Sequence, residues 1–381
     1  MAVTVKSFAK INLGLHIGAS RPDGFHELLT VYQTIALHDV LHISVKRGSG
    51  IEIQSADPRV PVDESNTCFR MAEKVMNAVG VKGRVVIEIE KRLPVQGGLG
   101  GSSTNAVATL LGLERALRKP LLATEKLRIA AEVGSDLPLF LVGGTVLGVG
   151  RGEQVFPLPD FPAMACVVVT PEIGVSTPKA FAEWDRIQGL KPLSHVSHDA
   201  ARKGRSSTIE SSAPMNTGHG FANLRSAGEP TRLRSAQARV AVPTGTSTKL
   251  TVLSASDRMN ELGRELSAWL SEMYSSAPSG LLARRGRAGN PLLELVQAGI
   301  QNDFEEVVFP EYPELGEAKS ALVRAGAKYA SLSGSGSTLY GLFGSRQASS
   351  SAVSRLRKAG WAAQVTSTLT RAAYWRRVIG G

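Results

Sequence analysis

The most informative part of this sequence is Pro94-Val95-Gln96-Gly97-Gly98-Leu99-Gly100-Gly101-Ser102-Ser103-Thr104-Asn105, which places four glycines within five residues and then two serines. Residues 85–90 alternate as in a half-buried strand, and apolar residues recur at helical spacing over 106–117. Glycine gives access to positive φ and lets a ligand come close, while a helix start offers unpaired N–H groups. The stretch therefore predicts a strand-to-helix loop that binds an anion such as phosphate. On the residues alone, a flexible connection capped by Ser102 or Ser103 remains the alternative.

Length and composition indicate a globular protein with room for two cores. The chain has 381 residues, of which 43% are hydrophobic. No apolar run approaches the roughly 18 residues of a membrane span, and the N-terminus lacks signal character. We therefore expect a cytoplasmic protein with no membrane partner. Cys68 and Cys166 lie in apolar surroundings, so we expect two core residues and neither a disulfide nor a metal pair.

The net charge of +11 is unevenly distributed along the chain. Residues 191–249 carry nine Lys or Arg against three Asp or Glu. The region from about 188 to 250 is rich in Ser, Thr, Arg and Gly and has little apolar periodicity. This composition predicts a disordered basic insert, so the charge by itself gives no reason to expect a nucleic-acid partner.

The apolar pattern predicts an α+β chain. A strand-rich start disfavours a doubly wound parallel sheet, and a strand-helix-strand-strand-helix-strand order near the C-terminus predicts a ferredoxin-like layer. Ser65 or Asn66 is expected to cap one helix, Gly80 to end it, and Thr124 to cap another. Strands are predicted over 3–17, 40–45, 51–54, 85–90, 145–150, 153–156, 165–170, 328–333, 338–343 and 361–367. Helices are predicted over 66–79, 106–117, 123–132, 256–274, 290–299, 312–325 and 347–359, with one more starting at 134–138 and another ending at Trp184.

The glycine stretch matches neither the Walker A loop nor the dinucleotide fingerprint. Its pattern Pro-x-x-Gly-Gly-Leu-Gly-Gly-Ser-Ser-x-Asn-Ala instead resembles the phosphate loop of the GHMP kinases, which phosphorylate small molecules. Three further motifs strengthen the resemblance, and it covers about 1–186 and 290–381. They are Ser7-Phe8-Ala9-Lys10-Ile11-Asn12-Leu13 with Arg21-Pro22-Asp23-Gly24-Phe25-His26-Glu27-Leu28, Gly134-Ser135-Asp136-Leu137-Pro138, and Ser331-Leu332-Ser333-Gly334-Ser335-Gly336-Ser337-Thr338.

The resemblance implies a two-domain fold and an ATP-dependent phosphotransferase. A ribosomal-protein-like N-terminal domain with the phosphate loop would span 1–161. A ferredoxin-like C-terminal domain would span 162–381, interrupted by the basic insert at about 188–250. The motifs around Lys10 and His26 imply transfer to the 2-hydroxyl of a cytidine diphosphate derivative of methylerythritol, in isoprenoid biosynthesis by the non-mevalonate route. The enzyme would be a monomer or a homodimer.

Two residues would carry the chemistry, because phosphoryl transfer needs a base for the alcohol and a cation for the oxygens. The resemblance assigns the base to Asp136 and the cation to Lys10. The alternatives are a helix N-cap for Asp136 and a solvated strand residue for Lys10. ATP is the co-substrate and Mg²⁺ its metal, held by phosphates and water because no acidic ligand is evident. The resemblance assigns ATP binding to Pro94, Gly97, Gly98, Leu99, Gly100, Gly101, Ser102 and Ser103.

The acceptor would contact residues from both ends of the chain. By resemblance His26 would bind the cytosine, and Phe25, where the family usually has tyrosine, and Phe181 would stack on it. Asn12 shares the strand face of Lys10 and is assigned to the acceptor as well. A packed turn histidine, a helix-core Phe181 and a surface Asn12 are the alternatives. The second glycine turn adds Ser335 and Gly336, which would approach phosphates or pack against the first loop.

The glycine loop departs from the family pattern at one residue. Gln96 stands where many relatives have glycine, which affects the expected shape of the loop. Two hypotheses compete with this assignment of function. The first is another GHMP kinase, of the homoserine or mevalonate type. The second is a non-catalytic protein of this fold that uses the insert to bind an anionic partner.

Overall fold

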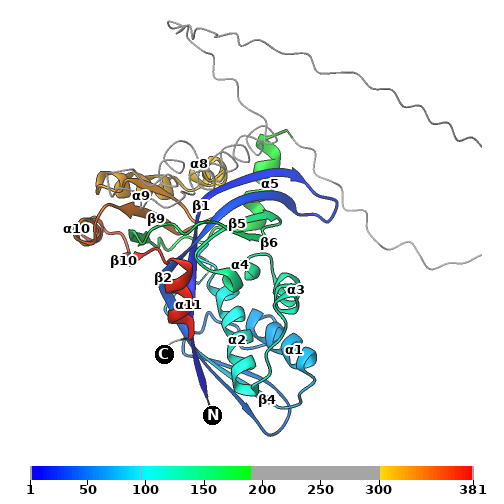
Figure 1. The fold of residues 1–381 in the computed structure, drawn as a ribbon. Helices are drawn as coiled ribbons and strands as arrows, with labels where there is room; N and C mark the ends of the chain where they lie inside the picture. The colour runs from blue at the N-terminus through cyan, green and yellow to red at the C-terminus, as the bar shows by residue number, and fades with distance from the viewer. Residues whose placement is uncertain (1, 96, 190–300, 380–381) are drawn as a thin grey trace, which may run out of the picture. The chain divides into compact units, whose positions relative to one another are not determined.

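The structure, a computed structural model, describes residues 2–95, 97–189 and 301–379 (Figure 1). The predicted basic insert beyond residue 189 lies outside the described residues, and so do the helices predicted over 256–274 and 290–299. The division into domains 1–161 and 162–381 stays a prediction.

The first sheet is built around a long antiparallel hairpin, β1 (Val3–Ser20) and β2 (His26–Lys46), which is visibly curved in Figure 1. β2 continues through the segment predicted as a separate strand over 40–45, because it pairs with a partner along its whole length. β1 lies beside β2, and the rest of the sheet follows the order β3-β4-β2-β5-β6. The other strands are β3 (Gly50–Ser55), β4 (Arg84–Glu90), β5 (Thr145–Gly150) and β6 (Gln154–Pro157).

Four helices belong to this first part: α1 (Thr67–Val79), α2 (Gly101–Leu117), α3 (Ala123–Val133) and α4 (Leu137–Val142). Asn66 caps α1 by accepting from the Cys68 amide, and Gly80 ends it at φ 64°, as predicted. α2 starts at Gly101 with no side-chain cap, so the alternative of a serine cap is wrong. The Thr124 cap is also wrong, because α3 begins after Leu122, whose carbonyl accepts the first helical bond.

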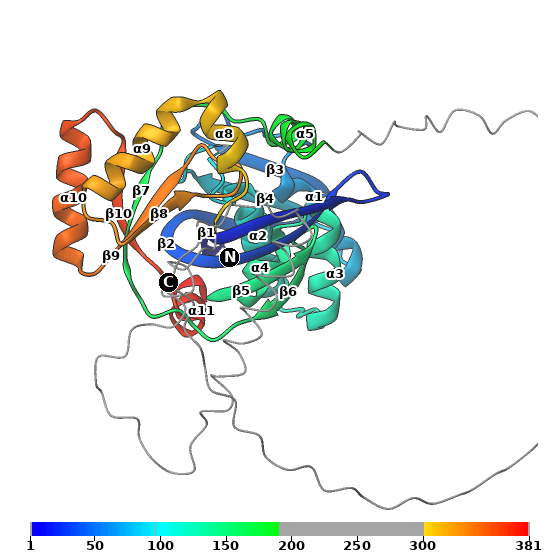
Figure 2. The same cartoon turned by 90° about the horizontal axis from the view of Figure 1, so that it is seen from above.

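The second sheet has the order β10-β7-β9-β8 with every neighbouring pair antiparallel. Helices α9 and α10 connect its strands in the order strand-helix-strand-strand-helix-strand, which confirms the ferredoxin-like layer. Figure 2 shows α9 and α10 beside this sheet. The elements are β7 (Ala165–Val169), α5 (Thr177–Ile187), α8 (Glu305–Glu311), α9 (Pro313–Arg324), β8 (Tyr329–Leu332), β9 (Leu339–Phe343), α10 (Arg346–Lys358) and β10 (Ala363–Ser367).

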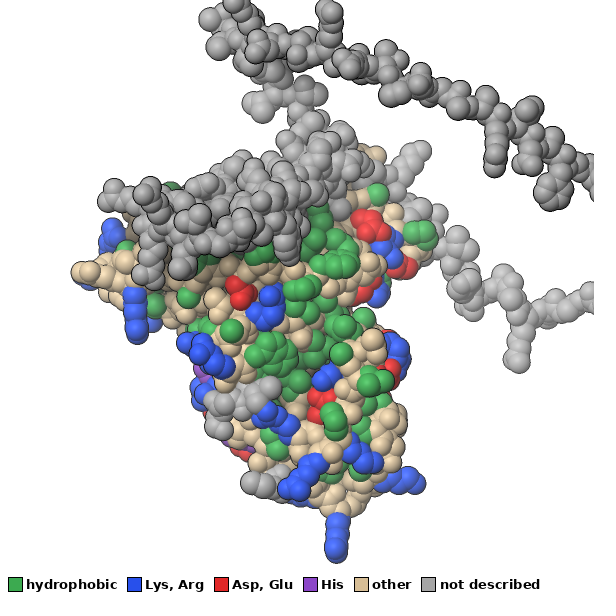
Figure 3. Space-filling model, viewed as in Figure 1, with side chains coloured by type: hydrophobic (Ala, Val, Ile, Leu, Met, Phe, Trp, Pro, Cys, Tyr) green, Lys and Arg blue, Asp and Glu red, His purple; other side chains and the backbone are tan. Residues whose placement is uncertain are grey.

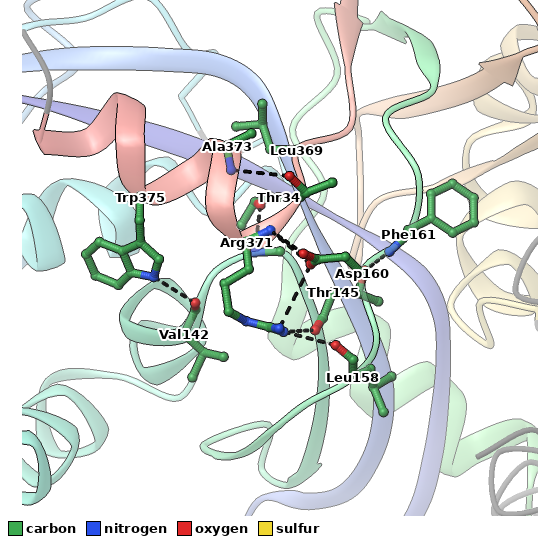
Figure 4. Close-up of polar contacts among 12 residues, drawn as sticks. Thr34, Val142, Thr145, Leu158, Asp160, Phe161, Leu369, Arg371, Ala373 and Trp375 are labelled. Atoms are coloured by element: carbon green, nitrogen blue, oxygen red, sulfur yellow. Dashed lines mark hydrogen bonds and ion pairs between the residues drawn. The ribbon is translucent and has the colours of Figure 1, made fainter. Parts of the chain in front are cut away.

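The chain ends in a helix that the sequence pattern did not predict, α11 (Arg371–Ile379). Its Tyr374 and Val378 are buried in the core of the first sheet. Figure 4 shows how the helix is fixed: the Arg371 amide donates to Asp160, and the Trp375 indole donates to the Val142 carbonyl at 3.0 Å. The C-terminal segment therefore returns to the part of the molecule that contains the glycine loop.

Both cysteines are buried and free, as expected. Cys68 belongs to the core of the first sheet, and Cys166 belongs to the apolar cluster between the sheets. Burial raises the pKa of the Cys68 thiol to about 12, so it stays protonated at neutral pH. These thiols therefore act as small apolar side chains in the packing.

Candidate active site at the glycine loop

The predicted cation and base lie side by side. Lys10 on β1 is 3% exposed, and its Nζ is 3.3 Å from Oδ2 of Asp136. The same ammonium donates to Oδ1 of Asn12 at 2.7 Å, because residues two apart on a strand share a face. Asn12 in turn donates to the Thr30 hydroxyl at 2.8 Å. The solvated alternative for Lys10 is wrong, since its ammonium is held inside the protein between two acceptors.

Asp136 occupies the N-cap position of α4, as the alternative reading predicted, but its side chain accepts no hydrogen bond from that helix. Its Oδ1 accepts instead from the Tyr32 hydroxyl at 3.1 Å, and its side chain remains 33% exposed. The carboxylate is therefore oriented by two partners, Lys10 and Tyr32, while part of it still faces solvent. This is the arrangement required of a group that receives a proton from a bound alcohol.

The fold provides a fitted space for Tyr32, a residue that the sequence analysis missed. A Cβ on Gly148 would lie 2.5 Å from the Tyr32 ring, and one on Gly152 would lie 2.4 Å from its hydroxyl. Burial, followed by the charge of Asp136, raises the pKa of Tyr32 well above its usual value. The hydroxyl therefore stays protonated and donates to Asp136 throughout the physiological pH range.

The glycine loop packs directly against the second glycine turn. Gly98 has φ +74°, and a Cβ there would lie 2.0 Å from the Ser333 carbonyl oxygen. The Ser333 hydroxyl donates to the Gly98 carbonyl at 2.9 Å, and the Thr338 amide donates to the Gly97 carbonyl at 3.2 Å. The loop also reaches β1, because the Lys10 amide donates to the Leu99 carbonyl at 3.0 Å. The loop is thus held between the second turn and β1, beside Lys10.

A buried asparagine holds the second glycine turn through its backbone carbonyls. Asn302 donates to the carbonyls of Leu332 and Gly334 at 2.9 and 2.7 Å. A Cβ on Gly334 would lie 3.5 Å from the Lys10 ammonium, so this turn also borders Lys10. Ser335 is 2.7 Å from the Thr177 hydroxyl. Gly336 contacts the first loop, since its carbonyl lies 3.1 Å from the position of a Gly98 Cβ.

A cavity of about 350 Å³ opens beside the loop and the start of α2. Ser102 lines it, whereas Ser103 lies one residue further into α2 and is not among the lining residues. Residue 96 lies outside the described residues. The remaining predicted ATP-binding residues all line the cavity, namely Pro94, Gly97, Gly98, Leu99, Gly100 and Gly101. Sequence reasoning missed Arg59, Asn66, Thr67 and Lys91, which come from other segments and line it as well.

A buried carboxylate fixes the point where the chain enters the loop. Asp39 accepts from the amides of Arg92 and Leu93 at 2.7 Å each and from the Lys91 ammonium at 2.6 Å. Asn105 of α2 donates to it at 3.0 Å. Strand β2, the loop entry and the helix that follows are thus joined at one fully buried group, which no sequence motif indicated.

The residues predicted to bind the base lie at the turn between β1 and β2 and on α5. His26 is 2.7 Å from Oδ1 of Asp185 and stacks on Phe181, with ring centroids 4.7 Å apart and an interplanar angle of 9°. Phe25 is 48% exposed, and the Arg151 guanidinium lies 4.8 Å from its ring centroid. Phe181 therefore faces His26 in this structure, and Phe25 presents the open aromatic surface.

Comparisons with known proteins identify the family of the chain. The chain matches the family models of the GHMP kinases N terminal domain over residues 66–144 and GHMP kinases C terminal over 282–361. Among solved structures, a 4-(cytidine 5'-diphospho)-2C-methyl-D-erythritol kinase is similar with a TM-score of 0.61 and 23% identity, over 96% of this chain and 99% of that one. A homoserine kinase from Cytophaga hutchinsonii gives 0.58 and 16%, over 97% and 95%. At these identities the two structures show the fold alone.

Sequence relatives extend along nearly the whole chain. A 4-diphosphocytidyl-2-C-methyl-D-erythritol kinase from Solibacter usitatus is 33% identical over 98% of this chain and 92% of its own length. A protein of the same name from Synechococcus elongatus is 31% identical over 94% and 91%. Since these relatives are more than 30% identical over most of both chains, the chain belongs to the 4-diphosphocytidyl-2-C-methyl-D-erythritol kinases of the GHMP kinase family.

Proposed function

We propose that this protein transfers the γ-phosphoryl group of ATP to the 2-hydroxyl of 4-diphosphocytidyl-2-C-methyl-D-erythritol, giving the 2-phosphate and ADP. This is a step of the methylerythritol phosphate route to isoprenoids. The observation that carries the proposal is the buried Lys10 ammonium, 3.3 Å from Asp136 and next to the glycine loop, in a chain related to these kinases over 98% of its length.

The catalytic pair acts on the acceptor hydroxyl. Asp136 accepts its proton as the oxygen attacks the γ-phosphorus, and ADP leaves from the opposite side. Lys10 stabilises the negative oxygens that develop. Tyr32 holds Oδ1 of Asp136, so Oδ2 remains directed to the lysine.

The loop and cavity accommodate the nucleotide. The phosphates bind at the N-terminus of α2, where amides are unpaired and the helix dipole is positive. The residues assigned to them are the loop glycines with Ser102 and Ser103. The base and ribose occupy the neighbouring cavity of about 350 Å³, beside Asn66 and Lys91.

Mg²⁺ comes to the site with ATP. Among the described residues, no group of three or more His, Cys, Asp or Glu side chains is placed to hold a metal ion. The Mg²⁺ ion is instead held mainly by phosphates and water, since Mg²⁺ usually keeps several waters. When bound, the ion neutralises charge on the phosphates.

The acceptor extends from the catalytic pair to the turn between β1 and β2. Asn12, next to Lys10, binds its polyol, and His26 hydrogen-bonds its cytosine. Phe25 and Phe181 supply aromatic surface to the base. Ser335 and Gly336 lie near its phosphates, on the turn that packs against the ATP loop.

We also propose a cytoplasmic enzyme that works as a monomer or homodimer without a nucleic-acid partner. Among the helices that the structure describes, none has both the length and the apolar character needed to span a bilayer. In the view of Figure 3, the described Lys and Arg side chains are spread out, with apolar and acidic side chains between them. That face of the described residues offers no continuous basic surface for a nucleic acid.

The direct test measures ADP release by the purified protein with Mg²⁺-ATP and 4-diphosphocytidyl-2-C-methyl-D-erythritol. Homoserine and mevalonate serve as control acceptors. We expect turnover with the cytidyl acceptor alone. Turnover with homoserine or mevalonate would keep the kinase and overturn the substrate, and no turnover from folded, ATP-binding protein would favour a binding role.

A further inference from the structure

The proposed acceptor has a charged middle section that the residues assigned above do not neutralise. Its base is assigned to Phe25 and His26, and its reacting hydroxyl to Lys10 and Asp136. The diphosphate joins these two ends and must lie between them. Because a diphosphate is multiply charged at neutral pH, it binds best to fixed cations, above all to guanidinium groups. The inference below rests on the proposed function, because it concerns this same acceptor.

The tip of the β5–β6 hairpin lies at this intermediate place. The Arg151 guanidinium is 4.8 Å from the Phe25 ring centroid, at the end assigned to the base. The next residue, Gly152, borders the other end. A Cβ there would lie 2.4 Å from the Tyr32 hydroxyl and 3.8 Å from Oδ1 of Asp136. Two consecutive residues therefore connect the aromatic surface with the catalytic carboxylate.

The Arg151 side chain is available to a ligand. It is 29% exposed, and its ion pair with Glu153 is loose, with Nε 3.8 Å from Oε1. The other Glu153 oxygen accepts from the Arg151 backbone amide at 2.6 Å. Such a partly solvated pair contributes little free energy, so a bidentate contact with phosphate can replace it.

We propose that Arg151 binds the diphosphate of the acceptor and makes the site selective for a nucleoside diphosphate over the nucleoside alone. The planar guanidinium contacts the Phe25 ring with its face and donates N–H groups from its edge, so both contacts are compatible. The acceptor is thereby held at its centre, with its hydroxyl end placed at Asp136.

The test compares Arg151→Gln with the wild type, using cytidine and CDP as competitive inhibitors against the acceptor. We expect the inhibition constant of CDP and the KM of the acceptor to rise about tenfold, the loss of one charge-assisted contact. The inhibition constant of cytidine and the KM of ATP stay unchanged. Arg151→Lys keeps the positive charge but loses the planar guanidinium that can bind phosphate through two N–H groups. Its CDP inhibition constant and acceptor KM are therefore expected to lie between those of the wild type and Arg151→Gln. Arg128→Gln, a surface arginine paired with glutamates on α3, is the matched control and should change none of these constants.

The outcomes separate the inference from the proposed function. An equal loss for cytidine and CDP would assign Arg151 to the base alone, and an unchanged CDP constant would remove it from the site. Either result overturns the inference while wild-type turnover still supports the kinase. Absence of wild-type turnover with the cytidyl acceptor would overturn both.

Discussion

At the scale of single residues, the site depends on one carboxylate held between a cation and a phenol. Lys10 and Tyr32 bind different oxygens of Asp136, so each partner fixes one side of the group. Neither bond follows from local sequence. Asp136 is 104 residues away from Tyr32 in the chain, and only the pairing of β2 with the β5–β6 hairpin brings them together. Lys10 and Asp136 could be predicted from their motifs, whereas Tyr32 has no motif.

Asp136→Asn tests the base directly. The amide keeps the size of the side chain but accepts no proton, so kcat should fall by about 10²–10⁴-fold. Binding of ATP should remain within about twofold, because the cavity beside the loop contains no atom of Asp136. Steady-state kinetics and a nucleotide-binding titration measure the two effects, with Glu132→Gln on α3 as a surface control. Wild-type kcat in Asp136→Asn would remove this residue as the base.

Tyr32→Phe tests the positioning of the carboxylate. Removing one hydrogen bond to a charged group should lower kcat about tenfold, with little change in the KM of either substrate. Tyr374→Phe is the matched control, because that buried hydroxyl donates to the Phe140 carbonyl at 2.7 Å, away from Asp136. The Tyr374→Phe variant should be less stable than the wild type, with an unchanged kcat. Equal kcat losses in both variants would mean that Tyr32 acts only through folding.

At the scale of elements, local pattern predicted most helices and strands but not their assembly. The helices α1, α9 and α10 were evident because apolar residues recur at helical spacing. Helices α8 and α11 were missed. Helix α11 is short and rich in arginine, and its apolar residues are buried only by contact with the first sheet. The glycine loop was predicted as a strand-to-helix turn. Its contact with the second turn depends on residues more than 230 positions away, which no local pattern could show.

Gly98→Ala tests that contact between the two turns. Gly98 and Gly80 both have positive φ, +74° and +64°, so an alanine at either costs about 1–2 kcal/mol of backbone strain. A Cβ at Gly98 would also overlap the Ser333 carbonyl, whereas at Gly80 nothing lies within 4 Å. Gly98→Ala should therefore lose most ATP binding and activity, while Gly80→Ala keeps both with a modest loss of stability. Melting temperatures and ATP titration distinguish the cases, and similar behaviour of the two variants would contradict the docking of the turns.

At the scale of the whole molecule, the segment 191–249 differs from the rest of the chain, because it is rich in Ser, Thr, Arg and Gly and has little apolar periodicity. Replacing the basic segment 191–249 by a short Gly/Ser linker should therefore leave kcat and KM within about threefold. Removing residues 371–381 is the contrasting deletion and should destabilise the protein, because Tyr374 and Val378 belong to the core of the first sheet. A folded but inactive linker variant would show that the segment contributes to the site.

The packing of the whole molecule also predicts its stability in alkali. Burial raises the pKa of the tyrosines at 32, 329, 340 and 374 and of both cysteines. In the unfolded chain these groups ionise near pH 9–10. The unfolded state therefore loses protons first, so stability is fully present below that range and falls as pH rises through it. Each group contributes on the order of 1 kcal/mol per pH unit above its unfolded pKa. Urea unfolding between pH 8 and 11 should show a steep loss of stability, and the tyrosinate absorbance of these four residues should appear only on unfolding. Two of the chain's six tyrosines, Tyr274 and Tyr312, are not among the four, so a Tyr274→Phe/Tyr312→Phe background removes their absorbance. In that background, absorbance that rises in the folded protein near pH 10 would show that the four hydroxyls reach solvent.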